Sequence, residues 1–185
     1  MEAGAPLRSP LASVKRRRAA LWLLAALTLV FGAAQLPSIG TMQDHGVGVV
    51  EFELMRTTAR TAQLLADLGQ KGRDAARTQL WLDYGYLISY GLFLSLACTA
   101  IAARARDRGN PRWRRVGEAL AWGALGAALF DAIENAALLR ILAGHAGQPY
   151  PAIAFSAAIG KFALSTAAIA YALAGWVALR RRTPA

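Results

Sequence analysis

Three ionisable residues, Asp131, Glu134 and Lys161, lie well inside long apolar runs and are the residues most able to do chemistry. A charge within a membrane span is costly, so a charged residue there is expected to have a functional role. At about 1.5 Å per helical residue, Glu134 and Lys161 each lie about 13 Å from the link between their two runs, and Asp131 lies about 18 Å from it. This matched depth predicts that Lys161 contacts Asp131 or Glu134.

Other polar residues lie near this group. Asn135 follows Asp131 by four residues and projects from the same sector of a helix. Asp83 lies one turn inside another apolar run, with Tyr90 below it on the same face. Arg140 lies at nearly the depth of Asp83, and we expect the two to pair. Arg140 could equally extend to the lipid headgroups.

Two carboxyl groups beside one lysine leave excess negative charge if all three ionise. Like charges in a low dielectric cannot all remain ionised, so we expect Asp131 or Glu134 to hold a proton near neutral pH. Two interpretations stay open. The group is either an ion pair that fixes helix register or part of a polar cavity with a proton-linked role.

Four segments are long enough, or nearly so, to cross a bilayer: 19–35, 80–103, 116–143 and 152–179. A hydrocarbon core of about 30 Å needs about 20 helical residues, and lipid permits only helices or closed barrels. The predicted fold is all-α, a four-helix transmembrane bundle over 19–179 with basic tails at 1–18 and 180–185. Residues 1–34 also fit a cleaved secretory signal, which leaves three spans.

The basic residues are concentrated in the two tails and in the link between the second and third spans. Because cytoplasmic loops carry the excess of Lys and Arg, we expect both termini in the cytoplasm and 38–79 outside. The net charge of +10 therefore reflects topology and contact with anionic lipids, not a nucleic-acid partner. The Ala-, Arg- and Gly-rich composition suggests a bacterial inner membrane.

The segment 38–79 is the only sizeable part outside the predicted spans. Pro37 is expected to end the first helix, so that no span contains a proline. Alternation over 47–54 indicates an extended stretch. Thr57 or Thr58 can cap a further helix that stops at Gly69. This short extracytoplasmic helical segment is either a simple connector or a lid over the bundle mouth.

Other chemistry has little support. His45 and His145 lack partners at ligand spacing, which predicts no metal site. Cys98 is the only cysteine, so no internal disulfide can form. No cofactor or enzyme motif is recognised. An intramembrane enzyme using Asp, Glu and Lys as acid and base ranks third among the hypotheses.

The sequence resembles a group of uncharacterised bacterial four-span membrane proteins. The similar pieces are Phe52-Glu-Leu with Arg56-Thr, Leu68-Gly69, Gly72-Arg73, Leu80-Trp-Leu-Asp83-Tyr84, Asp131-Ala-Ile-Glu134-Asn135 and Lys161-Phe162. This resemblance implies the four-span architecture and supports the selection of these polar residues as candidates for the site. It implies no activity.

The first functional hypothesis is binding or proton-linked movement of a small molecule or lipid in an outward-open polar cavity. The residues expected to line it are Asp83, Tyr90, Asp131, Glu134, Asn135, Arg140 and Lys161. Glu134 or Asp131 would carry the proton, and Lys161 would bind an anionic group or balance its charge. The alternative is a structural or accessory subunit, with a second copy or another membrane protein as partner.

Overall fold

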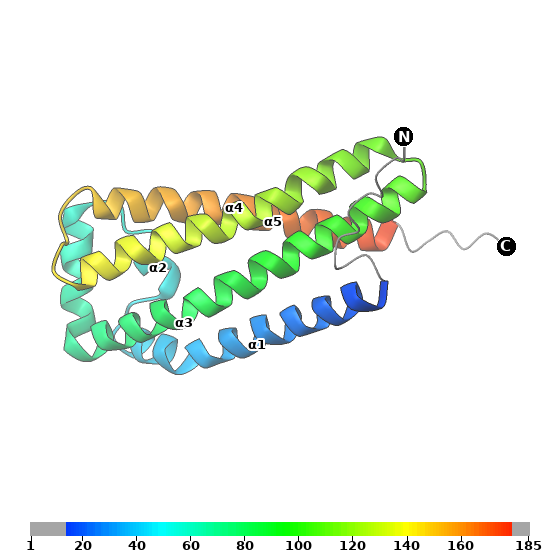
Figure 1. The fold of residues 1–185 in the computed structure, drawn as a ribbon. Helices are drawn as coiled ribbons and strands as arrows, with labels where there is room; N and C mark the ends of the chain where they lie inside the picture. Colours follow the sequence, from blue (N-terminus) through cyan, green and yellow to red (C-terminus); the bar gives the residue numbers. More distant parts are fainter. Residues whose placement is uncertain (1–13, 179–185) are drawn as a thin grey trace, which may run out of the picture.

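The computed structural model describes residues 14–178, and these form five helices without a strand (Figure 1). The helices are α1 (Val14–Asp44), α2 (Val49–Glu53), α3 (Thr58–Asp107), α4 (Pro111–Leu142) and α5 (Tyr150–Ala178). The four longer ones are long and apolar enough to cross a membrane. The all-α four-helix bundle and the multi-pass membrane class are therefore confirmed. The tail 180–185 and residues 1–13 of the other tail lie outside the described residues.

The long helices are arranged around α3. Helix α3 packs along both α1 and α4, and α4 packs along α5 (Figure 1). Helix α1 is attached mainly on this one side, and only Gln35 and Met42 of its residues are buried. Over the described residues, α1 does not pack closely against α5. Cavities with walls from α1, α3 and α5 lie between α1 and α5, and we call this region the slot.

The first helix does not end at Pro37, as the sequence predicted. Pro37 lies inside α1, which continues to Asp44. Proline is tolerated within membrane helices because local adjustments can satisfy the carbonyl that it leaves free. The stronger stop is Gly46, whose φ is +78°. The Gly46 amide donates to Gln43 at 2.8 Å and the Val47 amide donates to Met42 at 3.1 Å, the hydrogen bonds of a Schellman motif.

Residues 49–68 form an end cap that lies across one end of the bundle (Figure 1). Its first part, expected to be extended, is the short helix α2. The prediction for its second part is confirmed: Thr57 accepts from the Arg60 amide at 3.2 Å, and Gly69 interrupts the helix with φ +56°. The cap is no loose connector, because Phe52, Met55, Leu64 and Leu68 are at most 1% exposed.

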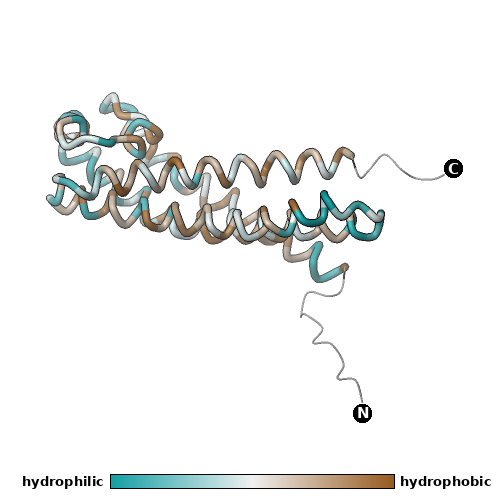
Figure 2. The backbone as a smooth tube through the Cα atoms, turned by 90° about the horizontal axis from the view of Figure 1, so that it is seen from above, coloured by the Kyte–Doolittle hydropathy of each residue, from teal (hydrophilic) through white to brown (hydrophobic). Residues whose placement is uncertain are grey.

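Two apolar clusters hold the bundle together. One lies beneath the end cap and includes Phe52, Leu68, Leu80 and Ile141. The other lies farther along and includes Leu94, Cys98 and Tyr171. Polar residues gather at the cap and at the link between α3 and α4, at opposite ends of the long helices (Figure 2). The polar group within the bundle lies where the cap meets the long helices.

Candidate functional site

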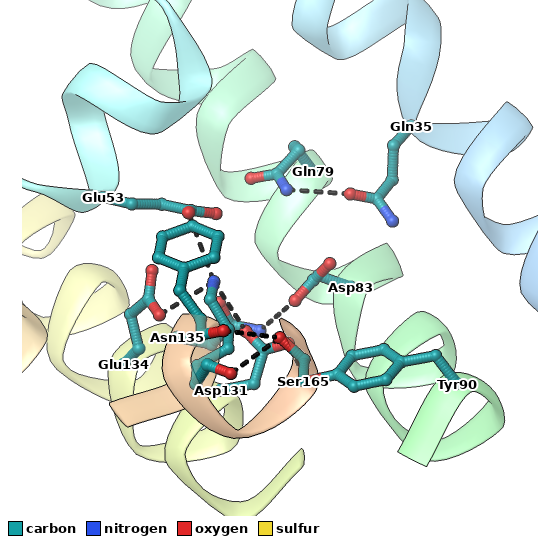
Figure 3. Close-up of polar contacts among 11 residues, drawn as sticks. Gln35, Glu53, Gln79, Asp83, Tyr90, Asp131, Glu134, Asn135 and Ser165 are labelled. Atoms are coloured by element: carbon teal, nitrogen blue, oxygen red, sulfur yellow. Dashed lines mark hydrogen bonds and ion pairs between the residues drawn. The ribbon is translucent and has the colours of Figure 1, made fainter. Parts of the chain in front are cut away.

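Lys161 of α5 is the centre of the polar group, and Figure 3 labels Glu53, Asp131 and Glu134, the three carboxyl groups that it contacts. Its Nζ lies 2.9 Å from Glu134 Oε2 and 3.2 Å from Asp131 Oδ1, so it contacts both residues that the sequence offered as partners. It also lies 3.2 Å from Glu53 Oε2. An ammonium group has three donors, and three carboxylates surround this one.

Glu53 is the member of the group that the sequence analysis missed. It lies at the end of α2, and its side chain is only 13% exposed. Burial raises the pKa of the Glu53 carboxyl above its ordinary value, while Lys161 opposes that rise. The available signal was an acid between the apolar residues Phe52 and Met55. The sequence places Glu53 in the segment 38–79 outside the predicted spans, and no local pattern predicts that this segment folds back onto α5.

Neutral side chains hold the carboxylates in place. Tyr90 Oη donates to Asp131 Oδ2 at 3.0 Å, and Asn135 Nδ2 donates to Asp83 Oδ2 at 2.8 Å, so each bond joins α3 to α4. Gln79 Nε2 donates to Gln35 Oε1 at 2.8 Å and joins α3 to α1 (Figure 3). Buried polar groups that are hydrogen-bonded specify one packing arrangement. These bonds therefore fix how the helices meet around Lys161.

Both carboxyl oxygens of Glu134 are fully buried, and neither has a hydrogen-bond partner among the described residues. The side chain is 0% exposed. Its contact with Lys161 is close, but it does not meet the directional requirement of a hydrogen bond. An ionised carboxylate buried in this way is costly unless it is paired and hydrogen-bonded. Glu134 is therefore paired in charge with Lys161 but lacks the hydrogen bonds that would complete its burial.

Charge around Lys161 is unbalanced. Four carboxyl groups gather here, those of Glu53, Asp83, Asp131 and Glu134, against the single ammonium of Lys161. All four ionised together would leave three uncompensated negative charges in a poorly solvated place, which repulsion and desolvation oppose. The group must therefore take up protons or another cation.

A cavity of about 580 Å³ opens beside this group, a size typical of small-molecule sites. Every helix contributes to its lining, including the slot faces of α1 and α5. Its charged residues are Glu53, Asp83, Asp131 and Lys161. Its aromatic residues are Tyr86, Tyr90, Phe93 and Phe162. We call it the polar cavity.

Six of the seven residues expected to line the cavity lie together, but only Asp83, Tyr90, Asp131 and Lys161 line it. Glu134 and Asn135 lie behind its wall as contacts of Lys161 and Asp83, and Arg140 lies apart. Arg140 is exposed, and no ion pair joins it to Asp83 within residues 14–178. The inward face of α4 runs from Asp131 through Asn135 to Leu138. Arg140 is about 200° around the helix from Leu138 at 3.6 residues per turn. Depth alone suggested the pairing, and the helical phase excludes it.

Searches of protein-family models, curated proteins and solved structures found no match to this chain. The resemblance to uncharacterised four-span proteins therefore stays a prediction. Among residues 14–178, no group of three or more His, Cys, Asp or Glu side chains is arranged to hold a metal ion. Any function must be argued from the polar cavity itself.

Proposed function

We propose that this chain binds a small amphiphilic molecule or lipid in the polar cavity and links its binding or movement to protons. The observation that carries the proposal is a cavity of about 580 Å³ walled by more carboxyl groups than cations. A register-fixing ion pair alone needs neither the cavity nor the additional acids.

The charge arrangement favours a ligand whose polar group is positive. Lys161 already faces three carboxylates, so an anionic group would enter a site where negative charge already exceeds positive charge. Asp83, by contrast, lines the cavity and accepts only from Asn135, through one of its two oxygens. Tyr86 and Phe93 lie on the same wall, and aromatic faces attract cations. We therefore infer a lipophilic cation as the preferred ligand, in place of the anionic group first considered.

Proton exchange follows from charge balance. In the empty cavity the excess carboxyl groups hold protons. When a cation enters, one carboxyl releases its proton to solvent and the total charge of the site does not change. Glu134 and Asp131 remain the candidate proton carriers, since both are buried and both contact Lys161.

Entry between α1 and α5 is favoured over entry through the capped end. The buried residues of the end cap close the end of the bundle, while α1 is held mainly by α3. An amphiphile dissolved in the bilayer could therefore reach the cavity sideways through the slot. In this view the outward opening first expected becomes a lateral one, and the cap with Glu53 serves as a lid.

Binding can be tested with tetraphenylphosphonium, a lipophilic cation, on the full chain in detergent. The wild type should bind the cation and release up to one proton per cation, as seen with a cation-selective electrode and a pH indicator. Asp83→Asn should weaken binding by about tenfold. Glu118→Gln is the control, because Glu118 pairs with Arg114 on the surface. Unchanged affinity in Asp83→Asn would refute the cation assignment.

The orientation belongs to the same proposal: an inner-membrane protein with both termini in the cytoplasm. It rests on the distribution of Arg and Lys. Reporter fusions at Gly69 and at the C-terminus should give opposite readings, and identical readings would contradict the four-span topology.

A structural or accessory subunit is the second candidate. Ala170, Ala174 and Ala178 of α5 are exposed and recur every fourth residue, the spacing that lets membrane helices pack closely. Replacing Ala174 with Leu should then disrupt a complex detected by cross-linking in membranes, without altering tetraphenylphosphonium binding. A lack of any cross-linked partner in the wild type would argue against this candidate.

A further inference from the structure

A second cavity lies in the half of the bundle away from the end cap. It has a volume of about 620 Å³, and its walls again come from α1, α3 and α5. The lining is almost entirely apolar, with Ala25, Ala97 and Leu173 among its residues. We call it the basal groove. It meets the polar cavity at Phe93, Leu94 and Ile169, which line both.

Two arginines mark the far end of the basal groove, Arg18 from α1 and Arg104 from α3. Both are exposed, and neither belongs to an ion pair within residues 14–178. Arg114 nearby on α4, by contrast, pairs with Glu118 at 2.9 Å. Among the described residues, therefore, no carboxylate pairs with either of the two guanidinium groups at the end of the groove.

The length of the groove corresponds to one leaflet. From Arg104 to Leu94 is ten residues of α3, or about 15 Å at the helical rise. Half of a hydrocarbon core of about 30 Å is also about 15 Å. The exposed Trp22 lies at the arginine end, as expected of an indole at the membrane interface.

We propose that the basal groove binds an anionic phospholipid, with its phosphate at Arg18 and Arg104 and one acyl chain along α3 toward Leu94. Apolar walls suit the chain, and two unpaired guanidinium groups suit the phosphate, since basic pockets between membrane helices recognise anionic headgroups. The site is separate from the polar cavity, and it does not depend on what that cavity binds. A bound chain would fill the slot where α1 has no protein neighbour.

The test is native mass spectrometry of the full chain released from nanodiscs of phosphatidylglycerol and, separately, of phosphatidylcholine. The wild type should retain one phosphatidylglycerol and no phosphatidylcholine under the same activation. Arg18→Gln with Arg104→Gln should weaken phosphatidylglycerol retention roughly 30-fold, about fivefold for each of the two basic residues near an anionic surface. Arg108→Gln with Arg112→Gln removes the same charge outside the groove and should retain the lipid.

A second variant tests the acyl chain separately. Ala97→Phe with Ala172→Phe fills the groove but keeps both arginines, and it should also lose the lipid while circular dichroism shows unchanged helicity. Equal loss in the two arginine pairs would mean a general surface-charge effect and would overturn the proposal. Equal retention of both lipids would indicate nonspecific annular binding. A lipid-free dimer that the Arg18 and Arg104 substitutions dissociate would make the occupant a second copy, and this too would overturn it.

Discussion

The two cavities share walls from α1, α3 and α5, yet they place their charges differently. In the polar cavity, Asp83, Asp131 and Lys161 are buried within the wall itself. In the basal groove, charge occurs only at the exposed end, at Arg18 and Arg104. The same three helices therefore contribute to one compartment that must balance internal charge, which α2 and α4 complete, and to one that only has to exclude water.

This difference indicates which half of the bundle should be more sensitive to substitution. A buried charge is stabilising only when partners satisfy it, and removing one partner leaves the others uncompensated. An apolar wall tolerates substitutions of similar volume, because its contacts are not directional. The polar half should therefore be sensitive to the identity of each residue, whereas the apolar half should be sensitive mainly to volume.

The largest predicted effect comes from Lys161→Met. It removes the ammonium that faces Glu53, Asp131 and Glu134, and the free energy of unfolding should fall by about 3–5 kcal/mol. Leu94→Met in the apolar cluster should cost less than about 1.5 kcal/mol. Denaturant titration in detergent measures both. Similar losses of unfolding free energy in the two variants would show that the polar half is no more sensitive to substitution than the apolar half.

A smaller loss is predicted for Gly91→Val, at the level where the two cavities meet. An added Cβ at Gly91 would lie 2.7 Å from Ala128 Cβ, so α3 and α4 would have to separate. Overpacking of this kind costs about 1–3 kcal/mol. Gly123→Val is the matched control, because its Cβ would meet Leu164 at an ordinary 3.6 Å. Thermal unfolding should distinguish the two, and a stable Gly91→Val would show that this contact can relax.

The sequence was sufficient for features that depend on local pattern or on the cost of burial. The four apolar segments gave the bundle, and Thr57 and Gly69 gave the limits of the cap helix. Matched depth placed Lys161 against both Asp131 and Glu134. Each inference used only the helical rise, a capping rule or the need of a buried ion for a partner.

Features that depend on tertiary arrangement were missed. Glu53 reaches Lys161 only because the cap folds over the bundle, and no local pattern encodes that fold. Pro37 was treated as a stop, although the glycine at position 46 ends the helix. Arg140 was placed by depth without its helical phase, which points it away from Asp83. In each case a rule based on position along the chain does not determine how the elements pack against one another.

The third prediction concerns Glu134→Gln combined with Lys161→Met. Removing both charges at similar volume should restore much of the stability lost in Lys161→Met alone, since replacing a whole buried pair is often nearly neutral. Restoration should be incomplete, because Glu53 and Asp131 lose the same partner. The double variant keeps Glu53, Asp83 and Asp131 without an ammonium, so the excess of carboxyl groups over cations is the same as in the wild type. It should therefore still release a proton when tetraphenylphosphonium is added. If it folds and binds the cation without releasing a proton, charge balance does not drive the exchange and the proposed function fails.

The smallest predicted effect is a pH dependence that arises at Glu53. The groups that face this carboxyl are Lys161, Asp131 and Glu134, and burial raises its pKa above the ordinary value of 4.5. An acid with a raised pKa binds more protons in the folded state than in the unfolded state. Its contribution to stability is therefore present below about pH 4.5 and is lost as the pH rises toward the folded pKa.

The measurement is the melting temperature of the wild type relative to Glu53→Gln, taken from acidic to neutral pH. Glutamine cannot titrate, so the difference between the two proteins isolates Glu53 from the other carboxyls. As the pH rises, the melting temperature of the wild type should fall relative to that of Glu53→Gln. Glu51→Gln is the control, because Glu51 lies two residues away but pairs with Arg60 on the surface. A difference that is constant with pH, or that moves the other way, would mean that the Lys161 contact outweighs burial at Glu53.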